Sequence, residues 1–557
     1  MKRFCAGVSF GVLLIVGCSG EEAPHATATA SLPACQPAQL AGVRPTYEEV
    51  QRHRRFDFST PTYAANEYPK TWGYRLLLRV DAEGRIVCHE TTDDFGTPIA
   101  TTPQRQALLA DIAQRRYAPF SREGKRVPAI VREEVWEERA SSVRRPLPEA
   151  PLDSFRIMLS RSGCFGWCPI YSVEIHGDGR VVYTGEGHVD VEGRHEYRIP
   201  VDDVRALLDQ VRQEDLWSTD TEYMAGITDN PTYCLSIELG GQRHVITDYV
   251  GRMVGMPRAV QRVEDAVDKV SRAREWTELS AFSMEHLQQA GFDFRSQAGA
   301  DLLVRAIGNR KGFDEHAMLR AIELGSPLRG GQTALRPTPE HALDEMEVFE
   351  SALRLGRVAL VEPLMAKGVL REGGRLDRGK LDRAFRAAIQ GGRLASVRAI
   401  WNASDSIRPS LMYQDEDDDD ARRIVATSVV MLLDKSYGDD EWEGLAIAKW
   451  LADKGAPLDA RAANGDSLLH IAVEASNIAF ARFVLAQGLD PSTKGEYDLP
   501  ALGGAQDEDV ALLLLASGSD WHMDDQGKGF LRYARDQRWT RVLELLKQPL
   551  EEGSAKR

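Results

Sequence analysis

The residues Asn-Gly-Asp-Ser-Leu-Leu-His-Ile-Ala at positions 464–472, followed by Phe-Ala-Arg-Phe-Val-Leu-Ala-Gln-Gly-Leu-Asp at 480–490, decide the fold of the C-terminal half. Their apolar side chains recur at helical spacing, and a glycine closes the second stretch at position 488. This pattern predicts two short helices joined by a tight turn. Gly455 ends an earlier stretch of the same kind, 33 residues before Gly488, so the helix pair is one unit of a repeat.

The unit resembles the ankyrin repeat, with Ser-Leu-Leu-His-Ile-Ala at 467–472 in place of Thr-Pro-Leu-His-x-Ala. Similar glycine endings at Gly325, Gly368 and Gly518 extend the pattern, and we expect six or seven units over residues 275–550. The resemblance implies an all-α solenoid in which each helix pair buries its apolar face against its neighbours. It also implies that His470 supports its turn by hydrogen bonding, and that residues 532–546 form a terminal cap.

The resemblance implies a protein partner on the concave face formed by the turns between units. The positions that we expect to contact it are Arg461, Asn464, Asp466, Lys494, Tyr497, His522 and Asp524. The alternative for each is an ordinary solvated loop residue.

A β-rich domain is predicted over residues 154–274. Cys-Phe-Gly-Trp-Cys-Pro-Ile-Tyr at 164–171, followed by the Gly-Asp-Gly of a predicted hairpin at 177–179, resembles a family of uncharacterised bacterial domains, which implies no activity. Cys164 and Cys168 suit a local disulfide, because a glycine between them permits a tight turn. A redox pair and a zinc site are the alternatives. A redox thiolate usually lies at a helix N-terminus, whereas the proline after Cys168 leads into a strand, and no further zinc ligands stand at recognised spacing. Cys234 is expected to be a buried free thiol.

A smaller α+β domain is predicted over residues 46–138, before a proline-rich linker at 139–153. Its strands at 74–80, 85–90 and 127–135 and its helix at 102–116 resemble the C-terminal domain of TonB-like proteins. In that family the edge of the sheet accepts an extended peptide. Pairing of Cys35 with Cys88 is a weaker disulfide candidate.

The N-terminus has two positive residues, an apolar run and Cys18, preceded by Ile-Val-Gly. These residues resemble the lipobox of bacterial lipoproteins, which implies a signal peptide at 1–17 and a lipidated Cys18; the alternative is an ordinary signal peptide. Residues 18–45 lack a hydrophobic period and are predicted to be a linker, which would reach roughly 80 Å if it were extended. Ser19 suggests the outer membrane, on either its periplasmic or its surface face. No second apolar run has spanning length, so the lipid is the only membrane attachment expected.

The bulk composition limits the function further. The chain has 557 residues and a net charge of −15, which argues against nucleic acid as a partner. Five cysteines remain after position 18, an odd number that suits an oxidising compartment with one thiol left over. No motif for a catalytic nucleophile, a phosphate loop or a metal site is present, so we expect no enzyme, no cofactor and no metal.

The sequence thus predicts a multidomain protein: two small α+β domains, an ankyrin-type solenoid and a short tail at 551–557. The expected function is a lipid-anchored interaction scaffold of the bacterial cell envelope that acts through the array. The alternatives are a TonB-like peptide-docking adaptor at the outer membrane and a thiol/disulfide redox protein that uses Cys164 and Cys168.

Overall fold

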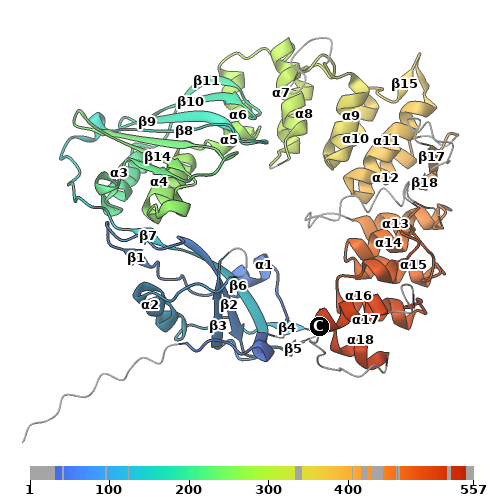
Figure 1. Ribbon diagram of the computed structural model, residues 1–557. Coiled ribbons are helices and arrows are strands. Elements are labelled where there is room, and N and C mark those ends of the chain that lie inside the picture. Colours follow the sequence, from blue (N-terminus) through green and yellow to red (C-terminus); the bar gives the residue numbers. More distant parts are fainter. Residues whose placement is uncertain are drawn as a thin grey trace, which may run out of the picture. The chain divides into compact units, whose positions relative to one another are not determined.

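The structure is a computed structural model, and Figure 1 shows its chain. The described residues are 32–40, 43–93, 97–122, 124–310, 312–332, 342–403, 406–414, 425–427, 443–459, 461, 465–522, 528–537 and 539–546. The predicted signal peptide, Cys18, Asn464, Asp524 and the tail lie outside them. The chain forms two compact units. The first contains the residues up to Leu147 with Val211–Thr228 and Ile246–Arg262, and the second contains Pro148–Gln210, Asp229–Val245 and the chain from Val263 onward.

The first unit is built on a three-stranded antiparallel sheet in the order β3-β2-β6. Its elements are β2 (Gly73–Val80), β3 (Ile86–Thr92), α2 (Pro103–Ile112) and β6 (Ala129–Trp136). Alternate residues of β2 are buried, as expected for a strand with one face on a core. Thr102 accepts the N–H of Arg105 and so caps α2, whose first residue is a proline. Strand and helix order agree with the sequence prediction, with small shifts at the ends.

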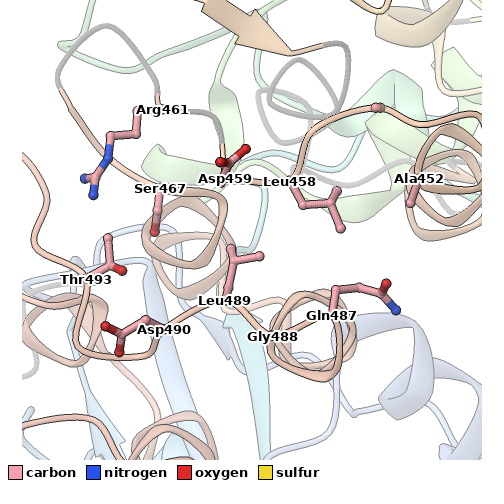
Figure 2. A pocket seen from close by; sticks show the side chains of 11 residues that line it. Ala452, Leu458, Asp459, Arg461, Ser467, Gln487, Gly488, Leu489, Asp490 and Thr493 are labelled. Carbon is pink, nitrogen blue, oxygen red and sulfur yellow. The ribbon is translucent and has the colours of Figure 1, made fainter.

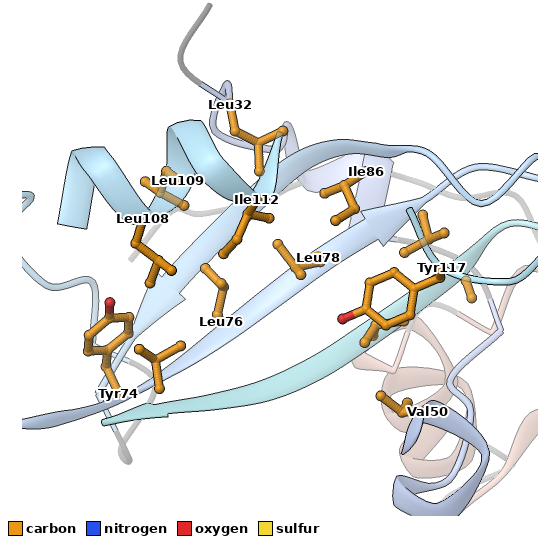
Figure 3. Close-up of a cluster of buried hydrophobic side chains, with 14 of the residues drawn as sticks. Leu32, Val50, Tyr74, Leu76, Leu78, Ile86, Leu108, Leu109, Ile112 and Tyr117 are labelled. Carbon is orange, nitrogen blue, oxygen red and sulfur yellow. The ribbon is translucent and has the colours of Figure 1, made fainter. Parts of the chain in front are cut away.

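The core of this unit lies between α2 and the sheet (Figure 3). Leu76 and Leu78 from β2 pack with Leu108 and Ile112 from α2. The unit also contains these smaller elements: η1 (Pro37–Leu40), α1 (Tyr47–His53), β1 (Thr62–Tyr63), β4 (Ser121–Arg122), β5 (Lys125–Arg126), β7 (Glu138–Arg139), η3 (Leu216–Ser218) and η4 (Gly251–Val254).

The prediction of a linker over all of 18–45 is wrong for its described part. Leu32 is only 5% exposed and joins the core cluster (Figure 3). The N–H of Cys35 donates to the carbonyl of His89 at 2.8 Å, and the N–H of His89 donates to Pro33 at 3.0 Å. A disulfide joins Cys35 to Cys88 of β3. A single leucine in a polar stretch has no period, so only the folded domain reveals its burial.

A seven-stranded sheet has the order β11-β10-β9-β8-β13-β14-β12. Its strands are β8 (Arg156–Arg161), β9 (Ile170–His176), β10 (Arg180–Gly187), β11 (Gly193–Arg198), β12 (Glu222–Met224), β13 (Tyr233–Leu239) and β14 (Gln242–Tyr249), and the helices α3 (Val201–Gln213) and α4 (Arg258–Ser271) follow β11 and β14. The hairpin turn between β9 and β10 contains Gly179 at φ +84°, where a Cβ would lie 2.5 Å from the carbonyl oxygen of Ile199. The position therefore requires glycine. The strands β11 and β12 were not predicted.

The part of the second unit from Arg274 onward is mostly helical. Its helices are α5 (Arg274–Thr277), α6 (Ala281–Gln289), α7 (Gln297–Gly308), α8 (Glu315–Glu323), α9 (Glu345–Arg354), α10 (Val358–Ala366), α11 (Arg378–Gly391), α12 (Leu394–Trp401), α13 (Gly444–Asp453), α14 (Leu468–Glu474), α15 (Ile478–Ala486), η7 (Ala501–Gly504), α16 (Glu508–Ala516), α17 (Lys528–Asp536) and α18 (Thr540–Leu545). Short helices follow one another in pairs, such as α7 with α8 and α14 with α15, as expected for a repeat array. The glycines predicted to end the second helices, Gly325, Gly368, Gly455, Gly488 and Gly518, all have positive φ.

The prediction of an all-α array needs a correction. Two small antiparallel pairs interrupt it: β15 (Arg371–Glu372) with β16 (Arg375–Leu376), and β17 (Met412–Gln414) with β18 (Val425–Thr427). The residues predicted to form the cap, 532–546, lie mostly in the two helices α17 and α18. Within the described ranges, none of the helices has the length and apolar character needed to cross a bilayer.

Candidate functional site

Three successive turns of the array carry the predicted contact residues, and side chains bind each turn to the next. We call them the first turn (residues 459–467), the second turn (490–500) and the third turn (519–522). Arg461 donates from Nη1 to the carbonyl of Gly465 at 2.9 Å, within its own turn, and to the carbonyl of Lys494 at 2.6 Å, in the second turn. Its guanidinium thus connects two units.

Two further side chains make the same connection. Asp466 accepts the backbone N–H of Glu496 at 2.9 Å. His470 Nε2 lies 2.9 Å from the carbonyl of Leu499, so Nε2 carries the hydrogen and donates it. The other ring nitrogen is then an acceptor, and it lies 2.8 Å from Ser467 Oγ. His470 therefore supports its turn as expected.

The second and third turns are joined in a similar way. Asp520 N–H donates to Ser492 Oγ at 3.0 Å, and Ser519 Oγ donates to the carbonyl of Pro491 at 3.0 Å. Because the bonds end on backbone atoms, they fix the path of the turns relative to one another.

The outer positions of these turns carry exposed side chains. Tyr497 is 78% exposed at the tip of the second turn. Lys494 is exposed and pairs with Asp498 at 2.8 Å, and His522 is exposed beside the ring of Trp521 at 3.8 Å between centroids. Of the predicted contact residues that the structure describes, Arg461 and Asp466 hold the turns together, whereas Lys494, Tyr497 and His522 face solvent.

A depression of about 580 Å³ lies between the first two turns (Figure 2). Leu458 and Leu489 give it apolar walls, and the carboxylates of Asp459 and Asp490 and the amide of Gln487 line it as well. No local sequence pattern indicates this depression. The aspartates stand shortly after repeat glycines, but the depression exists only because two units stack.

The Cys164–Cys168 segment forms a closed loop before β9. A disulfide joins the two cysteines, whose Cα atoms lie 5.6 Å apart. Between them, Phe165 and Trp167 point outward, with exposed fractions of 89% and 56%. In the part of the chain that the structure describes, no three potential metal-ligating side chains gather at this loop or elsewhere.

A half-buried polar network lies next to the loop. Asp268 of α4 forms an ion pair with Arg161 of β8 and accepts the hydroxyl of Tyr171 at 2.7 Å. The guanidinium of Arg161 lies 4.2 Å from the centroid of the Tyr233 ring. Burial raises the pKa of Asp268 above its ordinary value, and the positive charge of Arg161 opposes this shift. A cleft of about 290 Å³, which Arg274 and these side chains line, adjoins the network.

This network is suited to holding a helix on a sheet rather than to catalysis. Burial also raises the pKa of the Tyr171 hydroxyl, so the hydroxyl stays protonated and acts as a donor. The hydroxyl donates its hydrogen bond to Asp268. Cys234, expected to be buried, is a half-buried free thiol on β13.

The edges of the sheet in the first unit are partly occupied by the chain itself. Residue 34 pairs in parallel with His89 of β3, and Val43 accepts the N–H of Ile130 of β6 at 2.8 Å. A peptide docked on either edge would meet these segments.

The comparisons with known proteins concern parts of the chain. Residues 155–271, about a fifth of the chain, match the model of a domain of unknown function, DUF6438, which includes the Cys164–Tyr171 segment. No curated protein matches the chain. A similar solved structure is the crystal structure of the ankyrin repeat domain of Bcl-3, described as a unique member of the IkappaB protein family. It is 16% identical and covers 42% of this chain and 91% of its own, with a TM-score of 0.26.

Proposed function

We propose that this chain is a lipid-anchored interaction scaffold of the bacterial cell envelope and that its helical array binds a protein partner. The observation that carries the proposal is the connection between the turns. Side chains of one unit bind backbone atoms of the next, so the exposed Tyr497, Lys494 and His522 are presented on a surface ordered before binding. Ordering in advance lowers the entropic cost of association.

The chemistry of this surface suits a protein partner. An exposed tyrosine beside charged residues is often a binding hot spot in protein interfaces, because it combines a large apolar ring with a hydroxyl. The depression between the first two turns offers apolar walls and two carboxylates to a protruding side chain (Figure 2). The proposal assigns no catalytic step and no cofactor to the chain.

The anchor is part of the proposal and is supported by the sequence of residues 1–18 alone. Cys18→Ser should prevent lipidation and release most of the protein from the membrane fraction. A mass measurement of the mature N-terminus checks the modification directly. Ser19 supports placement in the outer membrane.

Two observations weigh against the alternatives. Cys168 is followed by Pro169 and a strand, so no helix N-terminus is present to stabilise a redox thiolate. The peptide-docking edge of a TonB-like domain is partly filled by the chain's own residues near positions 34 and 43.

The test is site-specific crosslinking in the native bacterium. A photoreactive residue at position 497 should capture a partner, which is then purified and its affinity for the chain measured. Tyr497→Ala should weaken the affinity for that partner about tenfold or more if the tyrosine is a binding hot spot.

The matched control is Tyr47→Ala, which removes a similarly exposed tyrosine, 71% exposed, from the first unit. Equal affinities of wild type and Tyr497→Ala, or the same loss with Tyr47→Ala, would contradict the proposal. Point substitutions are preferable to truncation near Arg274, because buried Trp276 stacks on Tyr183 of β10 at 5.6 Å and would be lost.

A further inference from the structure

The loop closed by Cys164 and Cys168 exposes two large apolar side chains. Phe165 is 89% exposed, and Trp167 is the one tryptophan with an exposed side chain among the residues that the structure describes. Exposure of such rings to water is unfavourable, by roughly 25 cal/mol for each Å² of apolar surface. Side chains of this kind usually mark a surface that is removed from water when a partner or a membrane binds.

The loop holds these rings away from the sheet. The disulfide closes the loop, and the N–H of Phe165 donates to the carbonyl of Asp229 at 3.1 Å. On the other side, Ser162 N–H donates to Thr232 at 3.0 Å. Trp167 meets the ring of His188 only at its edge, with the ring planes at 78°. The closed loop thus presents both rings to solvent, and we call residues 164–168 the aromatic tip.

The aromatic tip lies within an uncharged segment. Residues 162–173 contain no Asp, Glu, Lys or Arg, in a chain of which 27% of the residues are charged. The preceding residue, Arg161, is neutralised by Asp268. The tip can therefore leave water without burying an unpaired charge, which would be strongly unfavourable.

We propose that the aromatic tip inserts Phe165 and Trp167 into the interfacial region of a lipid bilayer. Tryptophan favours this region because its ring is apolar and its N–H remains able to hydrogen-bond. A protruding tip suits a bilayer, which needs no complementary pocket, whereas a protein partner would have to provide one.

The N-terminal part of the chain favours the same occupant. If Cys18 carries lipid, the 14 steps to the buried Leu32 span at most about 50 Å, so Leu32 of the first unit lies within that distance of a bilayer. A weak second membrane contact within the same chain is then intramolecular and gains from the effective concentration that the anchor provides. The contact is independent of the partner proposed for the array.

The test is vesicle flotation with the non-lipidated chain from Ser19, which keeps every described residue. The vesicles contain phosphatidylethanolamine and phosphatidylglycerol in a 3:1 ratio. We expect wild type to float with the vesicles and Phe165→Ser/Trp167→Ser to bind about tenfold more weakly, because two rings no longer partition. Both side chains are exposed, so the double variant should fold normally, and its melting temperature checks this.

Two further variants complete the design. Tyr47→Ser removes a similarly exposed ring, 71% exposed, from the first unit and should bind vesicles like wild type. Trp167→Phe should still float but should lose the fluorescence quenching that brominated lipids produce in wild type.

Any of three results would overturn the proposal: no flotation of wild type, equal flotation of the double variant, or binding abolished by salt and by omission of phosphatidylglycerol. A protein partner lost by the double variant, with no vesicle binding by wild type, would assign the tip to protein docking instead.

Discussion

At the scale of single residues, two non-glycine residues in the described part of the array, Ser476 and Asp498, have a positive φ. Gly356 and Gly392 follow the first helices α9 and α11 with φ of +69° and +71°. After α14, the corresponding position is Ser476, with φ of +51°. A side chain in the left-handed region is unfavourable by roughly 1 kcal/mol, which glycine avoids.

Ser476→Gly should therefore stabilise the array by about 0.5–1 kcal/mol. The midpoint of thermal unfolding measures the effect. The reverse change, Gly455→Ala, places a Cβ in open space at φ +90° and should destabilise through the backbone alone. A lower midpoint for Ser476→Gly would show that the serine hydroxyl matters more than its φ.

A second residue-scale prediction concerns Arg357, which is only 1% exposed. Its guanidinium donates to the carbonyls of Ile307 and Asn309 at the end of α7 and lies 3.6 Å from the centroid of the Phe313 ring. Arg357→Ala leaves buried carbonyls without donors, so we expect a loss of about 2–4 kcal/mol in unfolding free energy.

Arg357→Lys keeps the positive charge but lacks the planar guanidinium. Its free energy of unfolding should therefore lie between those of wild type and Arg357→Ala. Calorimetry of the three proteins gives the order. Identical unfolding of Arg357→Ala and wild type would show that water replaces the guanidinium.

Among single residues, the sequence predicted the role of His470 but not the roles of Arg461 and Asp466. The histidine belongs to a recognised repeat pattern. The other two bind backbone atoms about 30 residues further on, and such partners follow from the stacking of units rather than from any local pattern.

At the scale of elements, regular alternation and helix caps made strands and helices predictable. Residues 74–80 were predicted to form a strand; the strand begins one residue earlier and buries alternate side chains. Residues 193–198 form β11, in which only one side chain is buried. The sequence therefore shows no alternation of apolar and polar residues that would predict this strand.

The link between the β10–β11 connection and the array's first helices depends on Asp190, a buried carboxylate. Its oxygens accept the N–H of Leu279 at 2.7 Å and the side-chain amide of Asn309 at 3.2 Å. Arg305 donates from Nε to the carbonyl of Asp190 at 3.0 Å. Burial raises the pKa of Asp190 to about 6, even though these hydrogen bonds and the charge of Arg305 lower it.

The raised pKa of Asp190 determines how the stability of the folded protein changes with pH. The folded protein holds the proton more tightly than the unfolded chain, whose value is near 3.8, so stability from this group is greatest below pH 3.8 and is lost as pH rises through about 6. Between pH 5 and pH 7.5 we expect a loss of about 1 kcal/mol from Asp190 alone.

Asp190→Asn should remove this component and be more stable than wild type at pH 7.5. Thermal unfolding of both proteins at pH 5 and 7.5 measures the difference. The same pH dependence in wild type and variant would mean that Asp190 is ionised throughout the range.

At the scale of the whole molecule, composition and repeat pattern predicted a sheet-rich N-terminal region followed by a helical C-terminal region. They did not predict that the segment before residue 45 belongs to the first domain, because Leu32, a disulfide and backbone hydrogen bonds to His89 and Ile130 attach it, and none of these produces a local sequence period. The two disulfides also differ in the length of chain they enclose, with separations of 53 and 4 residues.

Loss of the Cys35–Cys88 bond should therefore destabilise more than loss of the Cys164–Cys168 bond. Chain entropy predicts about 4 kcal/mol for the longer loop and about 2 kcal/mol for the shorter one. Calorimetry of Cys35→Ser/Cys88→Ser and of Cys164→Ser/Cys168→Ser compares the two. The reverse order would show that native contacts, rather than loop length, dominate.

The Cys35–Cys88 bond also determines how a mechanical load enters the protein. A pull on the N-terminus would first extract Leu32 from the core and strain the hydrogen bonds to His89. The load would then reach a covalent bond to β3, a strand whose partner β2 lies between it and β6. With the disulfide intact, peeling of the N-terminal segment stops at residue 35, and tension beyond that point is carried by the sheet as a whole.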